Sequence, residues 1–237
     1  MKRKINTITI IFTISGASFL CLGQIDELQS HFAKGYFNTG VVNYKHDDCG
    51  EAIKCFRKAV EIKPDYDEAY FNMGEAYYCI DSLAKAIECY MKAVEINPKN
   101  DEAYFNMGEV YYYIDSLDKA IEYFLKAIEI KPNKDEPYYN MGIVYDHIGD
   151  YDKAIECYMK AIEIKPDDFE AYFMMGNAYY IKGNYHTAIE CYLKAVEINP
   201  NNSEAAYYSI GLTYQSLGNE AKASEYFEKA DRSENNE

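Results

Sequence analysis

Apolar residues recur along most of the chain at the spacings of amphipathic helices. Tyr70, Met73, Gly74 and Tyr77 are separated by three or four residues, so they share one face of a predicted helix. A short turn with Asp81 follows, where small and polar side chains let the chain reverse. A further apolar stripe then begins, and the pattern predicts a second helix that packs against the first.

The second predicted helix carries Ala86, Tyr90, Ala93 and Val94 on its buried side, and Pro98 ends it. Asp or Asn residues after such prolines are suited to cap the next first helix. On the exposed side of the second helices, acidic and basic residues one turn apart are expected to pair. These pairs are Glu88 with Lys92, Glu122 with Lys126, Glu156 with Lys160 and Glu190 with Lys194.

The two-helix pattern repeats every 34 residues. The units that begin at Asp67 and Asp101 agree at 24 of 34 positions, which chance does not produce. The last copy contains one inserted residue near Asn202. We divide the chain into six units, 33–66, 67–100, 101–134, 135–168, 169–202 and 203–237, and the period is marked by Pro64, Pro98, Pro132, Pro166 and Pro200.

The units resemble tetratricopeptide repeats. That family pattern asks for aromatic, large apolar, small and proline residues at fixed places, and the unit at Asp67 fills every place, with Tyr where the family usually has Trp. The first unit departs from the pattern at Thr39 and Asn43, and the last lacks the proline. The resemblance covers residues 33–237 and implies an all-α fold, an α-solenoid of stacked antiparallel helix pairs wound into a right-handed superhelix.

The first 23 residues are predicted to be a signal peptide. Three basic residues follow Met1, and residues 5–22 carry no charge. Cleavage after Gly23 is favoured over cleavage after Ala17, and Leu20 before Cys21 argues against a lipoprotein. An uncleaved membrane anchor is the alternative. We therefore expect an exported protein, periplasmic or extracellular, that makes no membrane contact after cleavage, with a lead-in segment at 24–32.

Composition and motifs exclude several classes of function. The formal net charge is −15, so nucleic acid is not an expected partner. The four histidines show no metal-ligand spacing, and no nucleophile motif or glycine-rich phosphate loop is present. Asp47 and Asp48 are interpreted as a turn and not as a metal site. We expect no enzymatic activity, no catalytic residues, no metal and no cofactor.

The cysteines of the mature chain are predicted to be packed and unpaired. Cys55, Cys89, Cys157 and Cys191 occupy the same place in successive units, where helix packing holds equivalent atoms about 9 to 10 Å apart, farther than a disulfide allows. A link between Cys49 and Cys79 stays open as the less favoured alternative.

The resemblance implies that the first helices line a concave groove in which an extended peptide binds. Their sixth residues include four asparagines, whose carboxamides can both donate to and accept from a peptide backbone. Generic repeats also often carry Asn at this place, so a purely structural role is an equal alternative. The four residues are Asn38, Asn72, Asn106 and Asn140.

Aromatic and acidic residues surround these asparagines. Phe71, Phe105 and Tyr139 at the fifth place are candidates either for ligand contact or for packing on a neighbouring first helix. The remaining groove candidates are Tyr78 and Tyr112 at the twelfth place and Glu75 and Glu109 at the ninth. The basic clamp with which chaperone adaptors of this family hold a carboxylate is missing.

We therefore expect a non-enzymatic scaffold that binds an extended, basic or neutral peptide segment of a protein partner. Two alternatives remain. The chain is a structural solenoid that assembles end to end, because no extra capping helix is apparent after Ala230, or it is an accessory subunit that recruits substrates to an enzyme. The sequence gives no oligomeric state.

Overall fold

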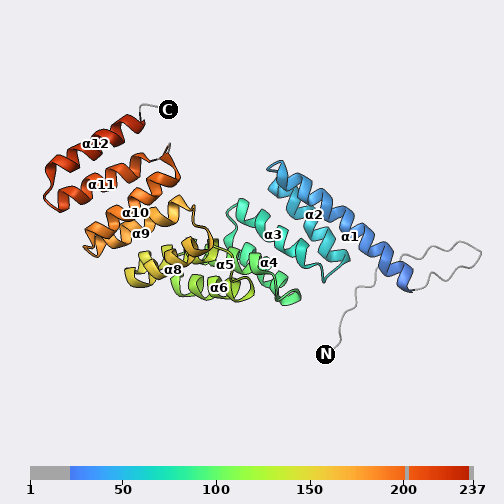
Figure 1. The fold of residues 1–237 in the computed structure, drawn as a ribbon. Coiled ribbons are helices and arrows are strands. Elements are labelled where there is room, and N and C mark those ends of the chain that lie inside the picture. The colour runs from blue at the N-terminus through green and yellow to red at the C-terminus, as the bar shows by residue number, and fades with distance from the viewer. Residues whose placement is uncertain (1–21, 201–202, 235–237) are drawn as a thin grey trace, which may run out of the picture.

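The computed structural model describes residues 22–200 and 203–234, and within them the chain forms twelve helices stacked as six antiparallel pairs. The predicted all-α solenoid is confirmed. Figure 1 shows α1 and α12 at opposite ends of an elongated, curved body. The helices are α1 (Leu22–Lys45), α2 (Cys49–Ile62), α3 (Asp67–Cys79), α4 (Leu83–Ile96), α5 (Asp101–Tyr113), α6 (Leu117–Ile130), α7 (Glu136–Ile148), α8 (Tyr151–Ile164), α9 (Phe169–Ile181), α10 (Tyr185–Ile198), α11 (Glu204–Ser216) and α12 (Glu220–Glu234).

Each helix pair closes on a contact between a glycine and an aromatic ring. In the third pair, Phe124 of α6 is buried, and a Cβ added at Gly108 of α5 would lie only 2.5 Å from its ring. The ring therefore occupies the space that any larger residue would need. The same contact joins Gly40 to Phe56, Gly74 to Tyr90, Gly142 to Tyr158, Gly176 to Tyr192 and Gly211 to Phe227.

A polar contact also joins the two ends of several units. The Asn97 side-chain nitrogen donates to Asp67 at 2.8 Å, and Lys131 Nζ lies 2.8 Å from Asp101 Oδ1. Both contacts link the first residue of a first helix to the residue that follows its second helix. They hold each hairpin closed at the end opposite its turn.

The charge pairs on the exposed side differ from the predicted ones. Of the four predicted pairs, only Lys126 with Glu122 forms, at 2.6 Å, and the Lys126 ammonium also lies over the ring of Tyr123, 4.7 Å from the centroid. The neighbouring units carry cysteine in place of Tyr123, and there lysine turns the other way. Those pairs are Lys92 with Glu95, Lys160 with Glu163 and Lys194 with Glu197.

The turns inside the hairpins require a left-handed residue, and the two halves of the chain meet this need differently. In the first three units the residue is aspartate, with φ near 60° at Asp115. In the last three it is glycine, with φ of 86° at Gly149. Asp48, at the predicted turn, caps α2 by accepting a hydrogen bond from the Glu51 backbone. The turn interpretation of Asp47 and Asp48 is confirmed.

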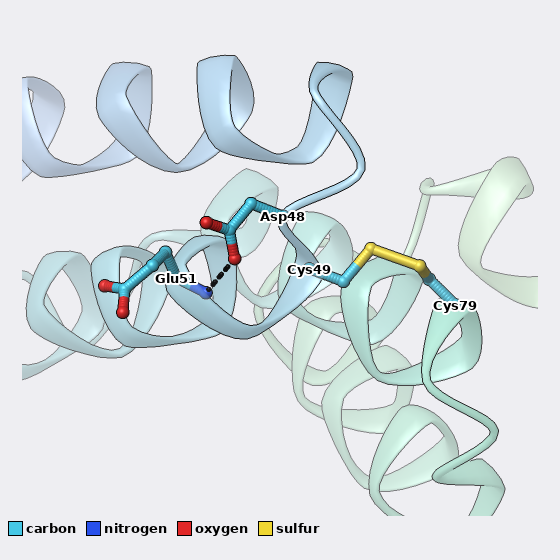
Figure 2. Close-up of a disulfide and its surroundings, with 4 residues drawn as sticks. All are labelled: Asp48, Cys49, Glu51 and Cys79. Atoms are coloured by element: carbon cyan, nitrogen blue, oxygen red, sulfur yellow. Dashed lines mark hydrogen bonds between the residues drawn. A yellow bond between two sulfur atoms is a disulfide. The ribbon is translucent and has the colours of Figure 1, made fainter.

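The preference for six unpaired thiols was wrong for two of them. Cys49 and Cys79 form a disulfide with Cα atoms 6.6 Å apart (Figure 2). Cys49 is the first residue of α2 and Cys79 the last of α3, so the link joins non-equivalent ends of adjacent units. The distance between equivalent positions does not apply to them. Cys55, Cys89, Cys157 and Cys191 are free, as predicted.

The first helix is longer than the other first helices. It begins at Leu22 and runs through the expected lead-in segment at 24–32 without a break. The predicted signal peptide lies outside the described residues except at its last two positions. Among the helices that the structure describes, none combines the length and apolar character needed to span a membrane.

Candidate binding groove on the first helices

The candidate residues lie on the first helices, at the second, fifth, sixth, ninth, twelfth and thirteenth residues of each unit. We call this surface the first-helix face. Helix periodicity brings these places to one side of each first helix, and stacking sets successive first helices beside one another. Its polar side chains differ from unit to unit.

The four asparagines do not form a uniform row. Asn38 is exposed, whereas Asn72 and Asn140 each donate to a backbone carbonyl four residues earlier, at 2.8 and 3.0 Å. Asn106 instead crosses to the preceding unit and donates to Glu75 at 2.5 Å. A carboxamide nitrogen carries two hydrogens and its oxygen can accept, so each side chain keeps capacity for a ligand.

The fifth-place aromatic rings pack inside their own units. Phe71 lies 5.9 Å from the ring of Tyr90, Phe105 lies 5.7 Å from Phe124, and each is half-buried. Tyr139 makes the same contact with the buried ring of its second helix, at 5.9 Å. The ring partner of each is thus in the second helix of its own unit. These rings support the wall of the face.

The twelfth-place tyrosines are more available. Tyr78 is 43% exposed, and Tyr112 is half-buried with its ring edge-on to His147 at 5.9 Å. Rings of this kind supply apolar contact area together with a polar hydroxyl. Tyr78 is therefore the aromatic candidate most accessible to a ligand.

Three tyrosines of the second helices also reach this face, which we did not predict. The Tyr90 hydroxyl donates to Glu75, that of Tyr158 to Asp146 at 2.6 Å, and that of Tyr192 to Asn177 at 2.8 Å. Each ring is buried in the core while its hydroxyl meets a first-helix side chain. Phe replaces Tyr in the other units, and this alternation in the sequence was the available signal.

Glu109 has a different environment from Glu75. Glu75 accepts hydrogen bonds from Tyr90 and Asn106. Glu109 is half-buried and receives no hydrogen bond from any residue that the structure describes, since Phe124 occupies the place of a tyrosine. Burial, followed by repulsion from Glu75, raises the pKa of Glu109 to about 7.

Asp146 is an acid of the fourth unit at the twelfth place, where the second and third units carry Tyr78 and Tyr112. Burial raises its pKa, while the hydrogen bond from Tyr158 opposes that rise. Its other carboxylate oxygen is buried without a partner among the described residues. Within the described ranges, no three side chains of His, Cys, Asp or Glu gather in a way that could hold a metal ion.

Sequence profiles of one repeat family match most of the repeat region. The profile described as TPR repeat matches residues 48–79, 82–115 and 176–218. Profiles described as tetratricopeptide repeat match residues 101–134, 136–168, 157–190 and 204–237. No curated protein sequence matches the chain.

Several solved structures share the fold. A crystal structure of MamA is 30% identical over 69% of this chain and 95% of its own, with a TM-score of 0.66. The crystal structure of YrrB, described as a TPR protein with an unusual peptide-binding site, is 26% identical over 75% of this chain and 91% of its own, with a TM-score of 0.65. PilF of Pseudomonas aeruginosa, 18% identical over 84% and 90% with a TM-score of 0.70, shows likeness of fold alone.

Proposed function

Because the chain belongs to the tetratricopeptide repeat family, a family of protein–protein interaction scaffolds, we propose that it is an exported, non-enzymatic scaffold. Its first-helix face forms a concave groove that holds an extended, basic or neutral peptide segment. The similarity to YrrB, a TPR protein described as having an unusual peptide-binding site, supports this class of ligand.

The observation that carries the proposal is the polar surface of the second and third units. Glu75, Asn106 and Glu109 lie together there, and Tyr78 is exposed beside them. Carboxamides that keep a free hydrogen and an acceptor suit backbone contacts, while carboxylates favour a cationic partner. Peptides with a net negative charge would be repelled.

Export is supported by two independent features. The basic start and the uncharged stretch at residues 5–22 have the form of a signal peptide. The Cys49–Cys79 disulfide favours an oxidising compartment, because disulfides are rare in reducing cytosol.

Peptide arrays test this function directly. We would probe the protein with twelve-residue peptides of net charge −3 to +3 in 50 and 500 mM NaCl. Basic and neutral peptides are expected to bind, with the basic ones at least tenfold weaker in high salt. Replacing Asn38, Asn72, Asn106 and Asn140 together by Ala should cost at least tenfold, whereas Asn133→Ala, in an exposed loop, serves as control. Unchanged binding after the fourfold replacement, or binding indifferent to salt, would contradict the proposal.

Self-assembly through the first helix is a second candidate. The outer side of α1 exposes Leu28, Phe32 and Val42, each by more than half. The exposed residues of α12 are mostly charged, so that end has the character of a solvated cap. Association would then join two α1 surfaces. Light scattering across a concentration series, on the parent and on Phe32→Ser, would show whether a dimer forms and depends on this surface.

A further inference from the structure

A small cavity opens on the first-helix face between the second and third units. Its volume is about 70 Å³, and it is lined by Glu75, Tyr78, Tyr90, Asn106, Glu109 and Val110. Tyr90 and Val110 are almost fully buried and close its inner end, whereas Tyr78 is exposed at its rim. The cavity therefore has an apolar and aromatic wall, an opening, and two carboxylates.

The two carboxylates are not equally compensated. Glu75 accepts from the Tyr90 hydroxyl and from the Asn106 carboxamide. No hydrogen bond or ion pair to the Glu109 side chain is formed anywhere in residues 22–200 and 203–234. A half-buried carboxylate without a donor is unfavourable unless a partner arrives.

A second, independent observation is that Glu109 departs from a rule kept by the other units. Where the buried second-helix ring is tyrosine, a polar first-helix residue accepts from its hydroxyl. Where the ring is phenylalanine in the first and last units, the ninth residue is apolar, Val41 or Leu212. In the third unit Phe124 stands with Glu109, so a charged group is retained where the scaffold supplies no donor.

The groups that face Glu109 and its cavity carry no positive charge. They are Tyr44 of α1, Glu75 and Tyr78 of α3, Tyr90 of α4, and Asn106 and Tyr113 of α5. A proton or a cation from outside would relieve the mutual repulsion of Glu75 and Glu109.

We propose that this cavity receives the ammonium end of a lysine side chain from the bound segment. This inference rests on the proposed function and names the side chain that the groove recognises. The cavity is large enough for water-sized groups to enter, so it admits a compact ammonium and the methylene beside it. The ammonium would pair with Glu109 and Glu75, and the methylene chain would lie along the exposed ring of Tyr78.

An arginine or a metal ion fits this cavity less well. The guanidinium presents its donors in a rigid planar fork, whereas the three rotatable donors of an ammonium can turn toward both Glu75 and Glu109. Calcium takes six to eight oxygen ligands, and the described residues bring no third carboxylate to the site. The compact point charge of lysine suits a site beside two carboxylates.

A lysine side-chain analogue tests the cavity without any peptide. The carboxyl ¹³C signal of Glu109 is followed against pH, at constant ionic strength, in n-butylammonium chloride, tetramethylammonium chloride or n-butanol. Butylammonium is expected to displace the proton and lower the Glu109 midpoint by at least one pH unit, whereas the wider cation and the neutral alcohol leave it in place. A midpoint that butylammonium does not move, or that tetramethylammonium moves equally, would overturn the inference.

Matched variants locate the effect. Glu109→Gln removes a poorly solvated charge and should fold, which a thermal melt verifies, and it should lose at least tenfold in butylammonium affinity measured on Tyr78 ring signals. Glu68→Gln, an exposed glutamate of α3, should lose none. Equal affinities in both variants would refute the site. If butylammonium binds but no peptide does, the proposed function fails and only an ammonium site remains, and if basic peptides bind but butylammonium does not, only this inference fails.

Discussion

The first three units and the last three units share one scaffold but differ in the chemistry of the first-helix face. The glycine-to-ring contact is the same in Gly108 with Phe124 and in Gly142 with Tyr158. At the ninth place, however, only the first half has carboxylates: its residues are Val41, Glu75 and Glu109, and those of the second half are Ile143, Asn177 and Leu212. The difference teaches that stacking holds the packing positions constant, while residues at single places of the first-helix face vary from unit to unit.

The two halves also restrain their chains differently. The first half contains the Cys49–Cys79 link and places aspartates in left-handed turns. The second half has no disulfide among its described residues and uses glycines such as Gly149 in those turns. A covalent link and unstrained turns are thus two separate ways of stabilising equivalent hairpins.

Loss of the disulfide is expected to have the largest effect and to stay within the first half. Cys49→Ser removes a link across 30 residues and should destabilise the first two units by about 2 to 4 kcal/mol. Native-state hydrogen exchange should show faster exchange in α2 and α3 and unchanged exchange in α8 to α10. Cys55→Ser is the control. Equal loss of protection in both halves would show that stability is not local.

Overpacking the glycine contacts should affect both halves alike. Gly108→Leu and Gly142→Leu each force a side chain into a buried ring and should cost about 1 to 3 kcal/mol. Gly35 of α1 meets no atom within 4 Å, so Gly35→Leu should not destabilise the chain. Chemical denaturation of the three variants measures this. If Gly108→Leu unfolds at the same denaturant concentration as the parent, the contact between Gly108 and Phe124 is not tight.

Glu109, in the first half, should make the free energy of unfolding depend on pH. The pKa of Glu109 rises from 4.5 to about 7 on folding, so between these values the folded protein binds more protons than the unfolded chain. Its stabilising contribution is present below pH 4.5 and is lost as the pH rises through 7. Allowing for partial exposure, Glu109→Gln should exceed the parent by about 1 to 2 kcal/mol at pH 8 and match it at pH 4.5. A constant difference across that range, measured by urea unfolding, would contradict this.

The turn residues should give the smallest effect. Asp115→Gly removes the strain of an aspartate in the left-handed conformation and should stabilise the first half by about 0.5 kcal/mol. The gain is small because glycine also raises the conformational entropy of the unfolded chain. Gly149→Asp should cost a similar amount in the second half. Thermal unfolding of the two variants measures both changes in stability. Shifts of the same sign would show that side-chain contacts, and not backbone strain, decide these turns.

The fold could be predicted from the sequence because the same pattern of small and aromatic positions recurs in all six units. The small and aromatic places, the turns and the four free thiols were all predictable from equivalent positions. The Cys49–Cys79 link was not favoured because it joins positions that are not equivalent. Stacked repeats bring the end of one unit beside the start of another, and period alone does not give that distance.

The candidate site was less predictable because side-chain partners cross between helices. The sequence identified Glu75 and Asn106 as face residues, but not that they bond to each other across two units. The exchange of Tyr90 for Phe124 in the second helices does encode which acid has a donor. Comparing each first-helix acid with the aromatic residue opposite it in the second helix would have shown from the sequence that Glu109 lacks the hydroxyl donor that Glu75 has.

The cross-link between the first two units has a mechanical consequence. If the chain is pulled from its two ends until every helix unravels, the segment between Cys49 and Cys79 stays closed, because the pull bypasses it through a covalent bond. Thirty residues at about 3.3 to 3.6 Å each make the stretched chain about 100 Å shorter than its reduced form. When the chain is stretched, the end that carries α1 therefore keeps a slack loop closed by the disulfide, whereas the end that carries α12 extends completely.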